Sequence, residues 1–259
     1  GEWDTRAPFF AAAIMAFLNT IYGFVVLKET LPSSNRRAFE LKRANPIGAF
    51  AQIGKFPVLI GLIVVMFIYN IGHHVYPSNW SFYTMLKFDW TPLDVGISMG
   101  VVGLLMAVVQ GGLIRIVIPA FGNVKSAMFG FIAAATAYVG IALAPNSYWL
   151  YACCLFSAFS GFIGPAVTSI MSNQVPQNQQ GELQGINASV GSLAAIIGPL
   201  MLTQSFTYFT SDESAIYFPG AAFLIAALLT VVGIIVFWAT KHIAIDAENI
   251  SRKNANKAQ

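Results

Sequence analysis

Two adjacent histidines, His73 and His74, are the titratable pair that stands nearest to an apolar stretch of this sequence. Because histidine changes charge near neutral pH, the pair is a candidate for proton binding or for sensing external pH. An interfacial histidine pair with access to water is the alternative. No aspartate or glutamate lies deep inside an apolar stretch, and so we expect no carboxylate proton carrier within this chain.

Uncharged polar side chains inside the apolar stretches are the candidates for a substrate cavity. An amide or hydroxyl without a partner is costly in lipid, so such side chains should turn inward, toward protein or water. Structural hydrogen bonding between helices is the alternative for each of them. The six candidates are Asn70, Gln110, Ser157, Ser160, Asn187 and Gln204.

Two Gly-Pro pairs, Gly164-Pro165 and Gly198-Pro199, also lie inside apolar stretches. Proline removes one backbone hydrogen bond and bends a helix, and the freed carbonyl must face protein or water. These residues are therefore candidates for gating and helix bending. Close packing between helices, which small residues permit, is the alternative.

Other kinds of chemistry have little support in the residues. Cys153 and Cys154 are adjacent in an apolar run, and we interpret them as packing residues because no second set of metal ligands accompanies them. No nucleophile, metal cluster or acid–base pair stands together, so we expect neither an enzyme nor a cofactor or metal. The basic residues have no base-stacking aromatics between them, which argues against a nucleic-acid partner.

Seven apolar stretches must position these side chains. The chain has 259 residues, of which 56% are hydrophobic and only 10% are charged, whereas soluble domains have about 25% charged residues. A bilayer core of about 30 Å needs about 20 helical residues, and backbone groups in lipid must pair within the helix. The sequence predicts an all-α polytopic membrane protein with spans near 8–27, 57–76, 93–118, 125–144, 147–173, 184–209 and 217–239.

Basic residues fall on one side of the membrane if the seven spans alternate. Of the 14 lysines and arginines, only Arg6 and Lys87 belong to the other side. The positive-inside rule makes the basic side cytoplasmic. We therefore expect the N-terminus of the chain outside and its C-terminus inside, with an outer loop over 77–92 whose aromatic residues anchor it at the interface.

One long polar connection divides the chain unevenly. We expect a leading helix over 1–28, a central cytoplasmic linker over 29–56, a six-helix transporter half of two three-helix repeats over 57–240, and a cytoplasmic tail over 241–259. The first residue is Gly1, and the first methionine, Met15, already lies in an apolar run. We therefore expect an internal piece of a longer protein, whose N-terminal part is missing.

Two cytoplasmic turns carry recognisable residues. The first turn, between the fifth and sixth spans, reads Gln180-Gly181-Glu182-Leu183-Gln184-Gly185, and Gly164-Pro165 and Gly198-Pro199 stand on either side of it. The second turn is flanked by Arg115 and Lys125. With these motifs the chain resembles, over about residues 8–240, the C-terminal half of the tetracycline/proton antiporters of the major facilitator superfamily.

This resemblance implies a secondary transporter of the bacterial inner membrane that exports a small lipophilic drug in exchange for protons by alternating access. It also implies that the coupling residue lies in the missing N-terminal half, and that the basic turn latches neighbouring helices. Tetracycline pumps carry a buried aspartate in the stretch that here reads Gly130 to Ala134, and they often place a histidine where Met106 stands. Transport of a different small solute and a non-transporting fragment or accessory subunit are the alternatives.

Overall fold

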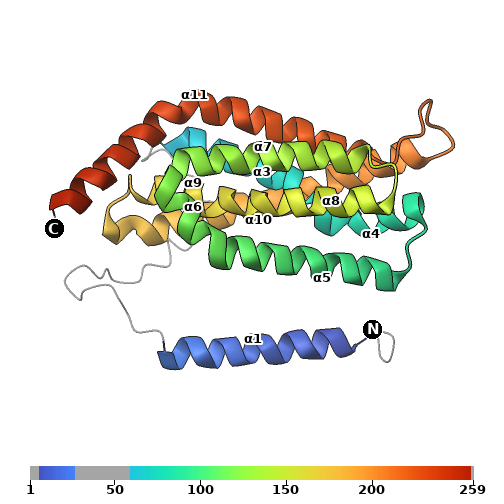
Figure 1. Cartoon of the computed structure of the whole chain (residues 1–259), viewed down its shortest axis with the longest axis horizontal. Coiled ribbons are helices and arrows are strands. Elements are labelled where there is room, and N and C mark those ends of the chain that lie inside the picture. Colours follow the sequence, from blue (N-terminus) through green and yellow to red (C-terminus); the bar gives the residue numbers. More distant parts are fainter. Residues whose placement is uncertain (1–5, 27–58, 258–259) are drawn as a thin grey trace. The chain divides into compact units, whose positions relative to one another are not determined.

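A computed structural model describes residues 6–26 and 59–257 of the chain (Figure 1). The chain divides into two compact units, Gly1–Phe39 and Glu40–Gln259. In the described part of the first unit, α1 (Ala7–Val26) is apolar and long enough to cross a membrane. The linker predicted over 29–56 lies outside the described residues.

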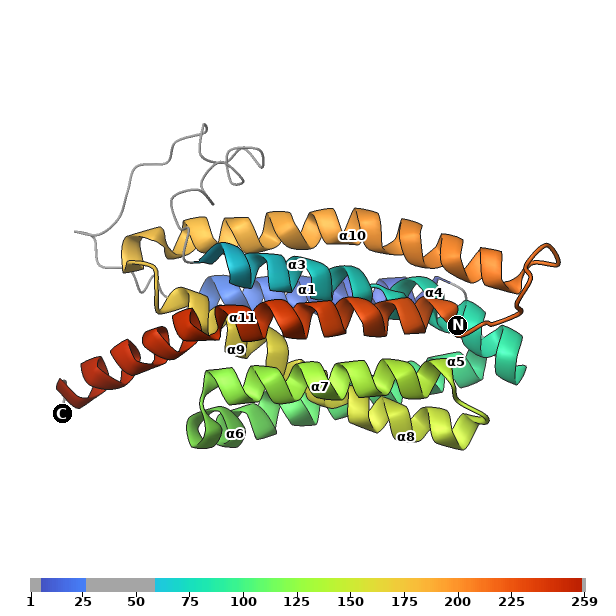
Figure 2. The same cartoon turned by 90° about the horizontal axis from the view of Figure 1, so that it is seen from above.

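The described part of the second unit contains six more candidate membrane spans, which Figure 2 shows running side by side. With α1 they make seven, and this confirms the predicted all-α class and span count. The first elements of the unit, in chain order, are α3 (Ile60–His73), α4 (Val75–Phe88), α5 (Pro92–Val108), the π-helix η4 (Val109–Leu113), α6 (Ile114–Phe121) and α7 (Asn123–Ala142). They are followed by α8 (Ser147–Ser157), the 3-10 helix η5 (Ala158–Phe162), α9 (Ile163–Ser172), the 3-10 helix η6 (Gln177–Gln179), α10 (Gln180–Thr210) and α11 (Ala221–Lys257).

Within the six-helix unit, α11 packs along both α7 and α3. Large side chains such as Phe131, Tyr138 and Phe237 are fully buried there. Small residues let the backbones approach: a Cβ added to Gly72 on α3 would lie 3.1 Å from the carbonyl oxygen of Ala226 on α11. Close van der Waals packing of this kind holds helices together in lipid, where the hydrophobic effect between helices is weak.

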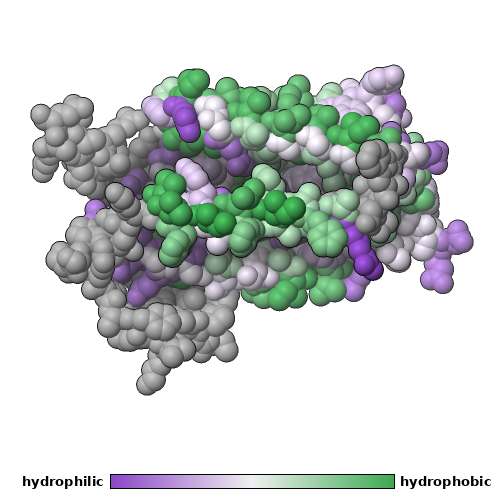
Figure 3. All heavy atoms as spheres, turned by 90° about the horizontal axis from the view of Figure 1, so that it is seen from below, coloured by the Kyte–Doolittle hydropathy of each residue, from purple (hydrophilic) through white to green (hydrophobic). Residues whose placement is uncertain are grey.

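The outer surface of the unit is apolar at mid-height. Large exposed hydrophobic side chains include Leu104, Ile196 and Leu228. On the face that Figure 3 shows, which includes the apolar helix α1 of the first unit, most of the outward-facing residues are hydrophobic. A soluble protein rarely exposes apolar surface on this scale, and the pattern fits helices that face lipid.

The first span of the unit is longer than the sequence suggested. We expected it to end near residue 76, with an aromatic loop over 77–92, and this prediction is wrong because α4 continues to Phe88. Trp80 and Tyr83 are buried inside the bundle, while Phe82 faces outward. The two histidines therefore lie in the middle of the span rather than near its outer end.

Polar residues of α4 caused this error, because they resemble a loop when read along the sequence. In the helix, the hydroxyls of Ser78 and Thr84 donate to backbone carbonyls four residues earlier, at 2.6 and 2.9 Å. Nε1 of Trp80 donates to Oγ of Ser98 on α5 at 3.0 Å. These hydroxyls and the indole N–H are thus paired locally or across one helix contact, which allows them to be buried in a membrane.

The ends of the last two helices also differ from those predicted from the sequence. α10 begins at Gln180, four residues before the predicted span. α11 begins at Ala221, after a turn, and continues to Lys257 through the segment expected to form the tail. Only the part up to Thr240 counts as a candidate membrane span.

Candidate functional site

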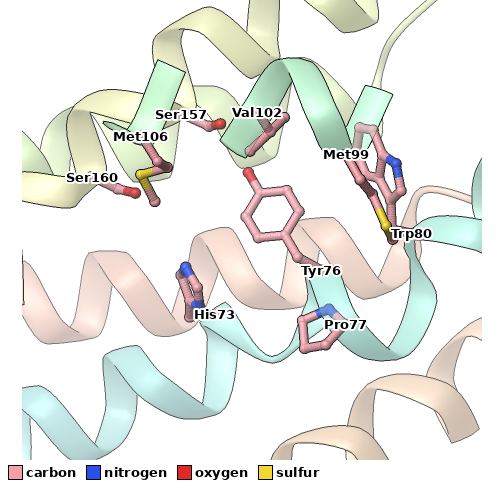
Figure 4. A pocket seen from close by; sticks show the side chains of 9 residues that line it. All are labelled: His73, Tyr76, Pro77, Trp80, Met99, Val102, Met106, Ser157 and Ser160. Carbon is pink, nitrogen blue, oxygen red and sulfur yellow. The ribbon is translucent and has the colours of Figure 1, made fainter. Parts of the chain in front are cut away.

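Two cavities lie one after the other along the first span of the unit. The first has a volume of about 190 Å³ and extends along α4 (Figure 4); it is lined by His73, Tyr76, Pro77, Trp80, Met99, Val102, Met106, Ser157 and Ser160. The second has a volume of about 200 Å³ and extends along α3; it is lined by Met66, Tyr69, Asn70, His73, Met106, Gln110, Ser160, Gly161, Gly164 and Pro165.

Three residues, His73, Met106 and Ser160, line both cavities. They come from three different spans, and each stands within about one residue of the middle of its span. In a bilayer the three side chains therefore occupy the same depth, close to the centre. We call these three residues the midplane belt.

The α-helical backbone is interrupted at the belt in all three spans. The first span breaks at His74, between α3 and α4. The second passes through η4 shortly after Met106, and the third through η5, which contains Ser160. Mid-helix π and 3-10 segments often mark functional sites or hinges, and inside a membrane they are tolerated where they are buried in protein or line a cavity.

Prolines account for two of the interruptions. Pro77 and Pro165 are each the third residue of the helix that resumes after the break, α4 and α9 respectively. Since proline has no N–H, the carbonyls of His73 and Gly161 lack the usual donor four residues later. The 3-10 helix η5 lies just before Pro165. At Pro199, by contrast, α10 continues as an α-helix without interruption.

The two glycines of the Gly-Pro pairs have different surroundings. A Cβ on Gly198 would lie 2.9 Å from the carbonyl oxygen of Ile71 and 2.9 Å from the Cβ of His74, so this glycine lets α10 approach the break in the first span. Gly164 lines the second cavity, and a Cβ there would meet nothing within 4 Å. Packing therefore explains Gly198, while Gly164 leaves the cavity open.

The structure brings together four of the six residues that the sequence proposed for a cavity. Ser157 lines the first cavity, Asn70 and Gln110 line the second, and Ser160 lines both. The other two, Asn187 and Gln204 on α10, line neither cavity, and Gln204 is exposed.

Sequence reasoning missed an aromatic column on the first span. The rings of Tyr69, His73, Tyr76 and Trp80 follow one another with centroid separations of 5.6, 5.7 and 5.9 Å. Their spacing of four, three and four residues places them on one helix face. This spacing crosses residue 76, where the span was expected to end, and it could have shown that the helix continues.

Arg115 and Lys125 flank the turn between α6 and α7, as predicted. Gly122 makes this turn with φ 83°, a left-handed conformation that glycine adopts readily. Both basic residues are exposed. Lys125 also lines a third, apolar cavity of about 470 Å³, together with phenylalanines of α6, α7 and η5.

The glutamine-glycine string does not form the turn that we expected, because residues 180–185 are the first turns of α10. The Gln180 side chain connects the end of α9 to this helix. Its Oε1 accepts a hydrogen bond from Oγ of Ser172 at 2.7 Å, and its Nε2 donates to the carbonyls of Ser172 and Val175 at 2.9 and 2.8 Å. The other three residues named for this turn, Gly181, Gln184 and Gly185, are exposed.

Replacing Gln180 by alanine should remove three hydrogen bonds and destabilise the connection between α9 and α10. Leaving the half-buried carbonyls without donors costs roughly 1–3 kcal/mol. Thermal unfolding of the purified protein in detergent measures the loss. Gln184→Ala is the matched control, since this glutamine is exposed in the same turn of helix. Equal melting temperatures for the two variants would contradict the bridging role of Gln180.

Comparison with known proteins places the chain in a family. The family model described as Major Facilitator Superfamily matches residues 1–199. The tetracycline resistance proteins of class C and class E from Escherichia coli are 29% and 31% identical to it over 90% and 91% of this chain. Multidrug resistance protein 2 from Bacillus subtilis (strain 168) is 27% identical over 88% of the chain.

A solved structure, that of the human organic anion transporter MFSD10 (TETRAN), superimposes with a TM-score of 0.74 over 90% of this chain at 23% identity, and it shows the fold. The chain spans 57% of the length of that structure and of the two Escherichia coli relatives. From the family match and the seven apolar helices, we conclude that the chain is an integral membrane protein and belongs to the major facilitator superfamily.

Proposed function

We propose that this chain is the C-terminal part of a secondary transporter that exports a small lipophilic molecule in exchange for protons. The observation that supports this function most directly is the midplane belt with its three interrupted helices. Transporters commonly place their substrate site near the bilayer midplane, on discontinuous helices whose irregular backbone lines a cavity. Two cavities that meet at one depth suit a molecule that enters from one side and leaves by the other.

The walls of the cavities favour a lipophilic substrate. Tyr69, Tyr76 and Trp80 contribute aromatic surface, and Met99 and Val102 contribute aliphatic surface. Neutral amides and hydroxyls supply the polar contacts, as in most small-molecule sites. The names of the relatives, tetracycline resistance proteins and a multidrug resistance protein, point to the same class of compound.

The domain arrangement follows from the same proposal. Residues 57–240 would form one half of the transporter, and residues 1–28 the last helix of the opposite half, with 29–56 as cytoplasmic linker and 241–259 as cytoplasmic tail. The basic side of the chain would face the cytoplasm of a bacterium. In alternating access the two halves rock about the substrate, and the interrupted helices at the belt let this half bend at that depth.

A transport assay on the longer protein to which we assign this chain tests the function. Inside-out membrane vesicles that contain it should accumulate tetracycline, or a chemically unrelated lipophilic dye, when the lumen of the vesicles is made more acidic than the outer solution. An uncoupler that collapses the gradient is the control, and it should abolish the accumulation. The proposed function fails if uptake of every compound equals that of vesicles without the protein.

Replacing Ser160 by phenylalanine should block this transport. Ser160 is the belt residue of the third of these spans, so a large ring there projects into both cavities. We expect uptake to fall by at least about tenfold, because a tenfold loss of affinity corresponds to only about 1.4 kcal/mol of binding free energy. Ser160→Ala, which removes only the hydroxyl, should keep most of the uptake. Unimpaired uptake by a folded Ser160→Phe variant would show that the substrate does not pass the belt.

A further inference from the structure

His73 is the member of the midplane belt that can change its charge. We propose that His73 is a proton-binding residue of this half, and that a proton on its imidazole and a substrate in the adjoining cavities exclude each other. The exchange rests on the proposed transport function, whereas proton binding by His73 does not.

The ring of His73 lies where the two cavities meet. It is half-buried, and it stands between the rings of Tyr69 and Tyr76 at centroid distances of 5.6 and 5.7 Å. Because the cavities extend from it along α3 in one direction and along α4 in the other, water in either cavity reaches the same imidazole. A proton can therefore arrive from one side of the belt and leave by the other.

Among the described residues that line the two cavities, none carries a carboxylate, ammonium or guanidinium group. The groups that face the ring or its aromatic neighbours are Tyr69, His74 and Tyr76 from its own span, Met106 and Gln110 from α5 and η4, Ser157 and Ser160 from α8 and η5, Tyr138 from α7, Cys154 from α8, and Phe223 from α11. An imidazolium at His73 would thus be the one formal charge among the wall residues in ranges 6–26 and 59–257. In a site of low dielectric such a charge acts strongly on anything else in the cavity.

His74 differs from His73 although the two are adjacent. Its Cβ lies against Gly198 of α10, which has no side chain to hold it away. It lines neither cavity, and its carbonyl accepts the hydrogen bonds that restart the helix, from the backbone N–H and the hydroxyl of Ser78. The sequence did not separate the two histidines; the structure assigns the cavity to the first and packing to the second.

The backbone at His73 allows its surroundings to change. Its carbonyl lacks the usual N–H donor four residues later, because residue 77 is proline. The helix is interrupted one residue later, so the segments before and after the ring can shift relative to each other. A movement at this point would alter which of the two cavities is in contact with the ring.

The chemical step is a single proton transfer. The unprotonated ring nitrogen of neutral His73 accepts a proton from hydronium in one cavity and leaves water behind, so that the residue becomes an imidazolium. When substrate occupies one cavity, it displaces the water that solvates this charge from that side, and the proton returns to water in the other cavity. No further reactant is needed, and one proton is exchanged for each passage of substrate through this half.

Nuclear magnetic resonance of ¹⁵N-histidine-labelled protein in lipid nanodiscs tests proton binding without any transport. The chain contains three histidines, and signals are assigned by their loss in His73→Gln and His74→Gln variants. The titration is followed from about pH 8 to about pH 2; the His73 ring should take up one proton within this range, with the protonated fraction falling as pH rises, and His74→Gln should leave this titration in place. A His73 ring that stays neutral throughout this range overturns the proposal.

Transport by the longer protein in the vesicle assay tests the exchange. His73→Gln should lower pH-driven accumulation by at least about tenfold, yet preserve downhill equilibration of the same compound, while His74→Gln should stay within about twofold of the parent. Accumulation by His73→Gln with the parental pH dependence would refute the exchange at this residue. If the parent protein moves none of the compounds, the transport function fails, and the resonance titration still decides whether His73 binds a proton.

Discussion

Replacing Ala134 by aspartate is expected to lower the free energy of unfolding by about 3 kcal/mol or more. Ala134 is 2% exposed, and it belongs to the main apolar core together with Phe131 and Ala137 on the same face of α7. It lines none of the three cavities. A carboxylate at this position would lose its water without gaining a cation or a set of donors.

This prediction bears on the resemblance to tetracycline pumps, which have an aspartate in the corresponding stretch. Thermal unfolding of purified Ala134→Asp in detergent measures the loss, and Ala134→Asn is the control, because asparagine has the same shape without the charge. The aspartate variant should be the less stable of the two above pH 6, and the difference should shrink as acid neutralises the carboxylate. Parental stability of Ala134→Asp at neutral pH would show that water or a counter-ion reaches this face of α7.

The number of spans and the all-α class could be predicted from the sequence because both are local properties. An apolar stretch of about 20 residues must form a helix in lipid, whichever helices it packs against, because its backbone groups have to pair within the stretch. The end of the span at Phe88 could not be predicted in the same way. Ser78, Asn79 and Thr84 are typical of a loop until the hydroxyls of Ser78 and Thr84 and Nδ2 of Asn79 are seen to be paired inside the helix.

The candidate site could be predicted only in part. Polarity inside apolar stretches was enough to select Asn70, Gln110, Ser157 and Ser160, since an amide or hydroxyl there must turn toward protein or water. Two features depend on contacts between spans that no single stretch reveals. One is that the three belt residues lie at the same depth, and the other is that π and 3-10 turns occur at that depth.

The separation of His73 from His74 is a further example of this limit. Adjacent residues on a helix point about 100° apart, so one of a pair faces a cavity when the other faces a neighbouring helix. The sequence does not state which is which. Gly198 on α10 decides it, because its missing side chain makes room for His74.

Replacing Gly220 by alanine should destabilise the unit at the opposite end of the bundle from the α6–α7 turn. The added Cβ would overlap the carbonyl oxygen of Ala142 and lie 2.8 and 2.9 Å from its carbonyl carbon and Cα. These are backbone atoms at the end of α7, which cannot rotate away as a side chain can. Overpacking of this kind costs about 1–3 kcal/mol, and thermal unfolding in detergent measures it.

The loss should exceed overpacking alone, because hydrogen bonds converge on the same backbone. The hydroxyl of Tyr83 donates to the carbonyl of Ile141, and Nζ of Lys87 donates to the carbonyl of Ala142 at 3.3 Å. If the end of α7 moves away from α11, these bonds lengthen, and each adds about 1 kcal/mol to the loss. Gly233→Ala is the matched control, since it is also buried, lies in α11, and its Cβ would meet nothing within 4 Å. Gly220→Ala with the stability of Gly233→Ala would mean that α7 and α11 are less closely joined at this turn than the packing indicates.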